Sequence, residues 1–280
     1  MFGQGNIKLF GGEPLLEPEL VRHVLVYVAN KPEIKSVYVS TNGLGLTTEW
    51  IEFFRSYPKA IVTISMDGRP EDHNRFRRTL PGVKDSYEHV RSLLPDLHRI
   101  PRLVVTQTIA PATANRAFDN FQHLRSLGFK RFNFLPGYFI PWRASQLENL
   151  GRNFQFIRNE IERSWASNQY IYVRNLFVRA PTPFFNQGLI VDSDQSIHPS
   201  NVGLSASLDH LRQETVVGTL QEPPSIEELK EKGRQVNEII QRAVSAKIWS
   251  STLAADLALT HFCQGLMPAF VTYKKKKGAA

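Results

Sequence analysis

The stretch Ile7–Leu16 combines an apolar run, a glycine turn and one carboxylate. Gly11 and Gly12 lack a Cβ, so a ligand can approach the backbone closely there. Pro14 favours an extended conformation for the residue before it and so aims the Glu13 side chain. A glutamate held at a strand end suits a cationic ligand, and we expect an α-ammonium group. The alternative is a plain strand-to-helix turn that binds nothing.

Two further polar turns follow apolar runs of the same kind. Ser-Thr-Asn-Gly at 40–43 follows a run at 37–39, and Ser-Met-Asp-Gly at 65–68 ends a run that starts at residue 60. Ser40, Asn42 and Asp67 supply hydroxyl, amide and carboxylate groups at these strand ends and are therefore candidate ligand contacts. In each turn the alternative is a side chain that serves only the backbone. Just beyond, His73 and Arg77 are placed to touch a substrate or to lie in a solvated loop.

Alternating strands and helices must position these turns. Each predicted strand is a short β-branched or aromatic run that ends in turn residues, at 7–10, 37–39, 60–64, 103–108 and 131–135. Helical patterns lie between or after them, at 17–30, 48–56, 86–97, 114–127 and 145–167. This alternation predicts a parallel sheet, in which ligand sites gather at the carboxyl ends of the strands.

The pattern changes after the predicted helix at 145–167. Residues 170–178 resemble one more strand, residues 188–198 predict a β-hairpin with an acidic turn, and Ser225 opens a helix with the spacing of a capping box. We therefore predict three parts: an α/β domain at 1–180, a small α+β accessory region at 181–273, and a basic disordered tail at 274–280.

Composition narrows the class of protein. No run of eighteen apolar residues and no signal-peptide pattern is present, so the expectation is a cytoplasmic protein that does not interact with membranes. The formal charge of +8 includes the four lysines at 274–277, and the arginines are scattered, so nucleic-acid binding is not expected. The single cysteine, Cys263, excludes an internal disulfide and a multi-cysteine metal site in these 280 residues. A hydrolase is disfavoured, because neither Gly-x-Ser-x-Gly nor His-Glu-x-x-His occurs.

The order GGEPLL, STNG, SMDG and VTQTIAP resembles the radical S-adenosylmethionine (SAM) barrel. It is most similar to the peptide- and protein-modifying branch, since LIVDSDQSIHPSNVGLS and VVGTLQEPPSIEEL resemble a SPASM or twitch extension. The resemblance covers nearly the whole chain. It implies a partial, open TIM-like barrel of parallel βα units with a small α+β C-terminal extension, and a peptide or protein as substrate or partner.

The resemblance also implies roles for individual residues. Gly11, Gly12 and Glu13, with Pro14 completing the motif, would line the methionine-amino side of SAM. Ser40 and Asn42 would contact its ribose or its carboxylate, and Asp67 would face the ligand or the substrate.

The sequence departs from the family pattern at the iron–sulfur ligands. A CxxxCxxC loop would hold a [4Fe–4S] cluster through three thiolates, and this sequence lacks that loop and the strand before it. Ser200 stands where the family typically has a cysteine, and Cys263 is either the relic of a second cluster or a small buried apolar residue. We therefore expect that these residues alone do not generate the 5′-deoxyadenosyl radical.

Two origins and two functions stay open at this stage. The sequence is either a fragment of an enzyme or a natural pseudo-enzyme, so its status as an enzyme is undecided. The alternative function is a non-catalytic binding module or scaffold that holds a peptide or partner protein in the barrel cleft. The aromatic stretch 132–142 would line that cleft or pack in the core. An open barrel edge also predicts self-association or a completing partner chain.

Overall fold

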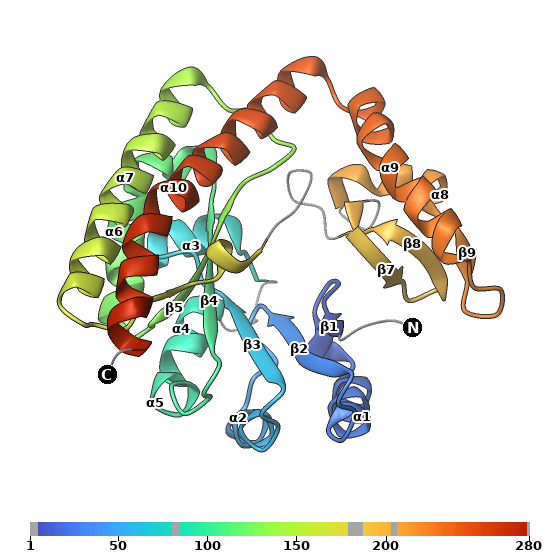
Figure 1. Ribbon diagram of the computed structural model, residues 1–280, viewed down its shortest axis with the longest axis horizontal. Helices are drawn as coiled ribbons and strands as arrows, with labels where there is room; N and C mark the ends of the chain where they lie inside the picture. Colours follow the sequence, from blue (N-terminus) through green and yellow to red (C-terminus); the bar gives the residue numbers. More distant parts are fainter. Residues whose placement is uncertain (1–4, 80–84, 179–186, 203–205, 279–280) are drawn as a thin grey trace.

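The structure is a computed structural model that describes residues 5–79, 85–178, 187–202 and 206–278. Its larger body is built on one curved sheet of six parallel strands (Figure 1). The strands follow one another in chain order: β1 (Gly5–Leu9), β2 (Ile34–Thr41), β3 (Ala60–Ser65), β4 (Val104–Ile109), β5 (Arg131–Pro136) and β6 (Tyr172–Val173). Because β1 and β6 form opposite edges and do not pair, the sheet is an open, partial TIM-like barrel, as predicted.

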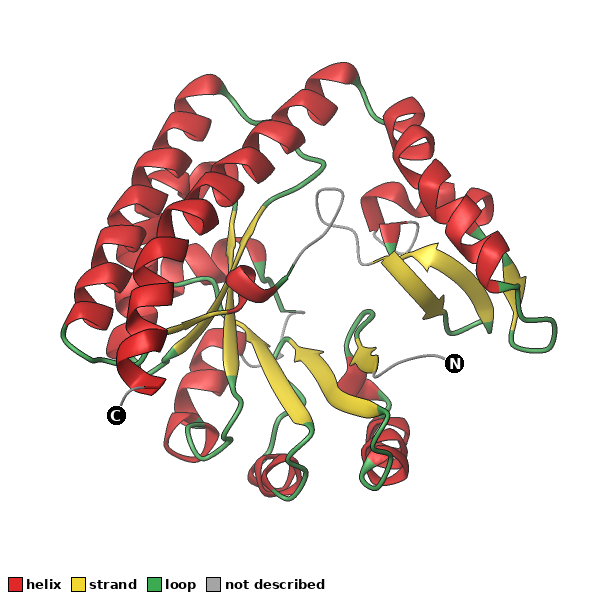
Figure 2. Cartoon of the chain, in the orientation of Figure 1, coloured by secondary structure: helices red, strands yellow, loops and turns green. Residues whose placement is uncertain are grey.

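Helices cover the outer face of this sheet (Figure 2). In chain order the helices of this body that precede the accessory region are η1 (Pro14–Leu16), α1 (Pro18–Val28), α2 (Thr48–Arg55), α3 (Pro70–Phe76), α4 (Ser86–Ser92), α5 (Leu94–Leu97), η2 (Pro111–Arg116), α6 (Ala117–Ser126), α7 (Ala144–Ala166) and η3 (Arg174–Phe177). Val37, Val39, Val62, Ile64 and Val105 point toward these helices and are fully buried in the core. Their burial fixes the register of the strands, since a shift by one residue would expose them.

The alternate strand positions face the inside of the barrel and are mostly polar. Ser40, Thr63, Ser65, Thr106 and Thr108 lie there, where a closed TIM barrel packs branched apolar side chains in layers. The inside of this open barrel is therefore a cavity and not a second core.

The accessory region forms a smaller body with its own core. Its antiparallel sheet comprises β7 (Gln187–Val191), β8 (Ser196–Ser200) and β9 (Gly218–Thr219), and its helices are η5 (Ala206–Leu211), α8 (Arg212–Thr215) and α9 (Ile226–Ala243). The predicted hairpin and the predicted capping box at Ser225 and Glu228 are both present. Phe139 from the end of the barrel packs into this second core with Val236 and Ile240.

The last helix, α10 (Ala246–Gly278), leaves the accessory body and runs beside α7, as Figure 1 shows. Phe262, Leu266 and Tyr273 from α10 are buried in the barrel core, so a part of the predicted accessory range 181–273 contributes to the larger body. The helix continues to Gly278, where the sequence predicted a disordered tail. Lysines are good helix formers and interact favourably with the negative end of the helix dipole. The predicted boundary at residue 180 lies outside the described residues.

No helix in the described ranges has both the length and the apolar character that a membrane crossing requires.

Candidate functional site

The Gly-Gly-Glu-Pro turn lies at the carboxyl end of β1. Gly11 has φ = +146°, a conformation that favours glycine. Gly11 and Gly12 are both exposed, and a Cβ added at either residue would meet no protein atom within 4 Å. Glu13 is extended (φ −153°, ψ 112°), as expected for a residue before proline. The turn therefore presents accessible backbone at the end of the strand.

The Glu13 carboxylate ties this turn to β2. Its Oε2 accepts a hydrogen bond from the Asn42 backbone N–H at 2.6 Å, and its Oε1 accepts one from the Leu15 N–H at 3.1 Å. Each oxygen thus already holds one backbone donor. Glu13 fixes the ends of two strands relative to each other, and the ligand contact expected from the sequence stays a prediction.

The end of β2 and the turn after it place one polar side chain in the cavity and use the others for local hydrogen bonds. Asn42 Oδ1 accepts the Leu44 N–H at 2.9 Å, and Thr41 Oγ1 accepts the Gly43 N–H at 3.0 Å. These bonds match the alternative in which the polar side chains serve the turn. Ser40, which precedes them, lines the cavity.

Asp67 is buried and holds Arg77. Arg77 Nε donates to Asp67 Oδ2 at 2.6 Å, and Nη2 donates to Oδ1 at 3.0 Å. The Thr108 backbone N–H also donates to Oδ1 at 2.9 Å, and Thr108 Oγ1 accepts from Arg77 Nη2 at 3.2 Å. Arg77 lines the cavity and Asp67 does not. Asp67, which the sequence predicted to face a ligand, therefore orients Arg77, and Arg77 lines the cavity.

His73 is fully buried and serves this same loop. Its Nδ1 accepts the Asp67 N–H at 3.2 Å, so its Nε2 carries the proton and donates to Ser86 Oγ at 2.8 Å. Burial lowers the pKa of His73 to about 4, and the positive charge of Arg77 adds to this. The ring is therefore neutral at pH 7 and supports the loop structurally. The sequence had suggested either contact with a substrate or a place in a solvated loop, and the buried ring has neither position.

The cavity inside the barrel has a volume of about 920 Å³, and residues of the sheet and of α10 line it. Asp256, Cys263 and Met267 line it from α10. Tyr138 also lines it, and its hydroxyl donates to Asp256 Oδ1 at 2.8 Å. Of the aromatic stretch 132–142, Phe134 and Tyr138 line the cavity, whereas Phe139 and Trp142 are buried in the two cores.

Burial controls the ionisation of these cavity groups. It raises the pKa of Tyr138 and of Asp256, and it raises the pKa of the Cys263 thiol to about 12, with the negative charge of Asp256 adding to the effect. Cys263 is thus a neutral thiol at pH 7. No motif in the sequence pointed to Asp256, because α10 was not predicted.

The described residues do not fit an iron–sulfur cluster. They contain no group of three or more Cys, His, Asp or Glu side chains that could hold a metal ion. Cys263 lies in the barrel cavity, and Ser200 is a buried residue whose Oγ accepts the Val202 N–H at 3.3 Å.

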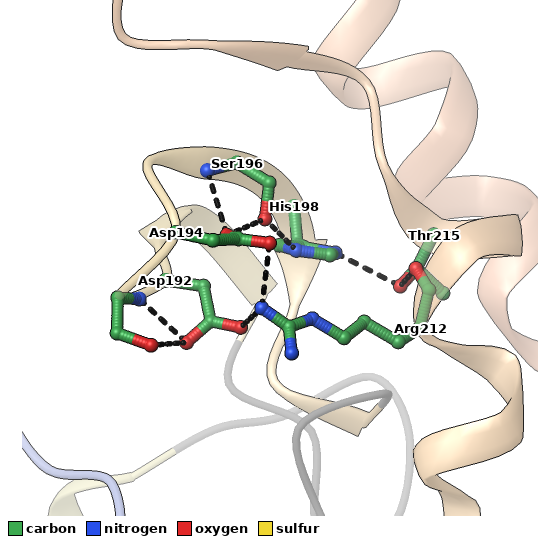
Figure 3. Close-up of polar contacts among 7 residues, drawn as sticks. Asp192, Asp194, Ser196, His198, Arg212 and Thr215 are labelled. Carbon is green, nitrogen blue, oxygen red and sulfur yellow. Dashed lines mark hydrogen bonds and ion pairs between the residues drawn. The ribbon is translucent and has the colours of Figure 1, made fainter.

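Ion pairs and hydrogen bonds join the hairpin of the accessory body to α8 (Figure 3). Arg212 Nη2 contacts Asp192 Oδ2 at 2.5 Å and Asp194 Oδ2 at 2.7 Å. Ser196 Oγ donates to Asp194 Oδ1 at 2.6 Å and lies 2.8 Å from His198 Nε2. The hydrogen bonds from Ser196 lower the pKa of Asp194 to about 2, and burial lowers the pKa of His198. These ion pairs and hydrogen bonds connect the β7–β8 hairpin to α8.

Comparisons with known proteins agree with this architecture. Among solved structures, anSMEcpe with bound AdoMet has a TM-score of 0.66 at 18% identity, covering 83% of this chain and 68% of that chain. The native anSMEcpe with bound AdoMet and Cp18Cys peptide has a TM-score of 0.65 at 18% identity, covering 84% and 69%. At this identity the likeness shows the fold alone. A search of curated proteins found no match.

The family model of the radical SAM superfamily matches residues 1–140, which contain the three strand-end turns and Arg77. This chain therefore belongs to the radical SAM superfamily.

Proposed function

We propose that the strand-end part of the cavity binds SAM. The observation that carries the proposal is Arg77, which Asp67 and Thr108 fix at the cavity wall. Arg77 Nη1 forms no hydrogen bond to any of the described residues, which leaves it available to the α-carboxylate of SAM. An arginine already held in place loses little side-chain entropy when it binds a carboxylate.

Neighbouring residues suit the other groups of SAM. Under the proposal, the exposed backbone of Gly11, Gly12 and Glu13 lies beside the methionine-amino group, and Ser40 hydrogen-bonds to the ribose. Asn42 contributes through its backbone bond to Glu13, which holds the two strand ends together. In this superfamily, SAM bound to a [4Fe–4S] cluster is the source of a 5′-deoxyadenosyl radical.

We also propose that a peptide occupies the rest of the cavity. A volume of about 920 Å³ lies at the upper end of the range for ligand pockets and leaves room beyond one SAM molecule. Apolar side chains such as Phe10 and Met267 line the cavity together with polar ones, a mixture that suits a peptide. A structurally similar protein, anSMEcpe, was solved with both AdoMet and a peptide, which supports this assignment.

The proposal for these 280 residues is binding and not radical chemistry. A [4Fe–4S] cluster needs three thiolates here, and the sequence has one cysteine, so the cluster ligands would have to come from outside these residues. A second candidate, a peptide-binding module or scaffold, is favoured by the accessory body, in which Arg212 of α8 pairs with Asp192 and Asp194 of the hairpin.

Titration of the purified protein with SAM by calorimetry tests the proposal. We expect binding to the wild type, a loss of at least tenfold in affinity for Glu13→Ala, and no change for the control Glu17→Ala, an exposed residue one turn further on. If wild-type protein does not bind SAM, the SAM site is refuted, and peptide binding alone would favour the scaffold.

A further inference from the structure

Two cations line the cavity at positions that the SAM site does not use. Arg174 lies in η3, directly after the last strand of the sheet, and Lys8 lies on the first strand. Tyr38 on β2 lies opposite Lys8 in the strand register, and the Arg174 guanidinium carbon is 4.2 Å from the centroid of the Tyr38 ring. Arg174 therefore spans the open barrel, from one edge of the sheet to the strand next to the other edge.

The strand register places Lys8 and Tyr38 away from the proposed SAM site. Lys8 precedes the exposed Gly11 by three residues, and Tyr38 precedes Ser40 by two, so both lie further from the carboxyl ends of the strands. A ligand that reached them would extend down the barrel from the strand ends.

Holding two cations together here is unfavourable. Burial lowers the pKa of Arg174, and burial together with the positive charge of Arg174 lowers the pKa of Lys8. Although the Lys8 side chain as a whole is exposed, enough protein surrounds its ammonium group to desolvate it. The Tyr38 ring offsets only part of this cost, since a cation–π contact is worth about 0.5–2 kcal/mol.

The acidic groups near the cavity do not neutralise Arg174. Of the described cavity-lining residues, Asp256 alone is acidic, and it accepts a hydrogen bond from Tyr138 and has a raised pKa. Asp67 is bound to Arg77. In the described ranges, no carboxylate forms an ion pair with Arg174. The cavity wall at Arg174 is therefore positively charged.

We propose that Arg174 and Lys8 bind a carboxylate of the peptide substrate, supplied by an acidic side chain or by the peptide C-terminus. The planar guanidinium fork matches a carboxylate, and the ammonium adds a second charge. Leu176 and Met267 line the same cavity and suit the methylene groups that carry such a carboxylate. This inference rests on the proposed peptide-binding function and names the class of peptide.

Small peptide mimics test the inference without SAM. We would titrate the protein with N-acetylglutamate amide and with N-acetylglutamine amide, which differ in charge at nearly equal shape, and follow binding by NMR. The expected result is at least tenfold tighter binding of the glutamate compound. If N-acetylglutamine with a free C-terminal carboxylate binds more tightly than N-acetylglutamate amide, the carboxylate comes from the peptide C-terminus. Equal affinities, or tighter binding of inorganic phosphate than of either carboxylate, would overturn the proposal.

Variants locate the site. Arg174→Gln and Lys8→Gln should each reduce the preference for the charged compound at least fivefold, and Arg174→Lys should retain a part of it. The matched control is Arg131→Gln, because Arg131 also stacks on a tyrosine, 3.9 Å from the centroid of the Tyr172 ring, but does not line the cavity. An equal loss in Arg131→Gln would contradict the assignment. If Arg174→Gln is misfolded by circular dichroism, Lys8→Gln decides the question.

The SAM titration separates this inference from the proposed function. Arg174→Gln should bind SAM within twofold of the wild type, and an equal loss of SAM affinity and of carboxylate preference would assign Arg174 to SAM and refute the inference. A wild-type protein that prefers the glutamate compound but does not bind SAM would refute the SAM site and support the carboxylate site.

Discussion

Arg77 and Asp67 form a two-point ion pair, with Nε to Oδ2 at 2.6 Å and Nη2 to Oδ1 at 3.0 Å. The carboxylate is buried at the end of β3, whereas the guanidinium reaches the cavity wall. The pair therefore connects the end of the third strand to the cavity wall.

Removing the charge of Asp67 should weaken both the fold and the site. Asp67→Asn leaves Arg77 without its counter-ion in a largely buried position, so we expect the free energy of unfolding to fall by about 2–4 kcal/mol. SAM affinity should fall together with it, because Arg77 is no longer fixed. Urea unfolding and SAM calorimetry measure the two effects. Unchanged stability would show that the pair contributes nothing to the fold.

Replacing Gly68 by alanine should lower the stability of the protein, whereas replacing Gly12 should lower only its affinity for SAM. Gly68 has φ = +144°, and a Cβ there would lie 2.2 Å from Asn120 Cγ, so Gly68→Ala should cost about 2 kcal/mol or more in unfolding free energy. Gly12 has open space, so Gly12→Ala should stay within about 0.5 kcal/mol of the wild type and yet bind SAM more weakly. Equal SAM affinity in Gly12→Ala would remove that residue from the site.

Stability should rise with pH across the range in which His73 titrates. Its pKa is about 4 in the folded protein and near 6.5 when unfolded, so the unfolded chain binds more protons between these values. The contribution of His73 is complete above pH 6.5 and is lost as the pH falls toward 4. It totals about 3 kcal/mol, at about 1.4 kcal/mol per pKa unit. Urea unfolding from pH 4.5 to 7.5 should show a steeper dependence for the wild type than for His73→Gln. Parallel curves would contradict the assignment.

The sequence predicted the elements that local patterns specify. The strand-end turns, the extended Glu13 before proline and the helix cap at Ser225 each depend on a few neighbouring residues, and the structure has them all. The sequence did not predict the helix α10, because its apolar residues do not gather on one face and because Gly265 and Pro268 break the helical sequence pattern. Its stability comes from packing on α7, which no local pattern records.

Long-range pairs account for what the sequence did not predict at the site. Nothing in the local sequence around Tyr38 indicates that Arg174 will stack on it, since the two meet only when the sheet curves. The predicted strand at 170–178 shortens to two residues because the chain turns into η3, and that turn places Arg174 in the cavity. The sequence identified Asp67 as a candidate contact and placed Arg77 only in the region beyond the turn, so it did not predict the ion pair between them.

The Cys263 thiol should react slowly with iodoacetamide. A pKa of about 12, compared with 9 for an ordinary thiol, reduces the thiolate fraction at pH 8 by a factor on the order of 100–1,000. The alkylation rate of the folded protein should therefore still increase at pH 10, whereas in urea it should level off near that pH. Asp256→Asn should speed the reaction. Rapid alkylation of the folded protein at pH 7 would contradict the buried, neutral thiol.

The accessory body should depend on Arg212 and not on iron. Arg212→Gln removes both contacts to the acidic turn, so amide hydrogen exchange should quicken in β7, β8 and α8 but not in the barrel sheet. The control Arg234→Gln breaks an exposed pair with Glu231 and should leave exchange unchanged. An iron chelator should have no effect on the wild type. Loss of protection in the accessory body on chelation would contradict a metal-free fold.

The most direct test of the SAM site compares two arginine variants by calorimetry with SAM. Arg77 and Arg116 each bind a buried aspartate through two nitrogens, Asp67 and Asp72 respectively, but of the two only Arg77 lines the cavity. We predict that Arg77→Gln lowers SAM affinity by about 10–100-fold, the typical value of a charged hydrogen bond, and that Arg116→Gln leaves it within twofold. Equal affinities in the two variants, or a loss confined to Arg116→Gln, would contradict the site.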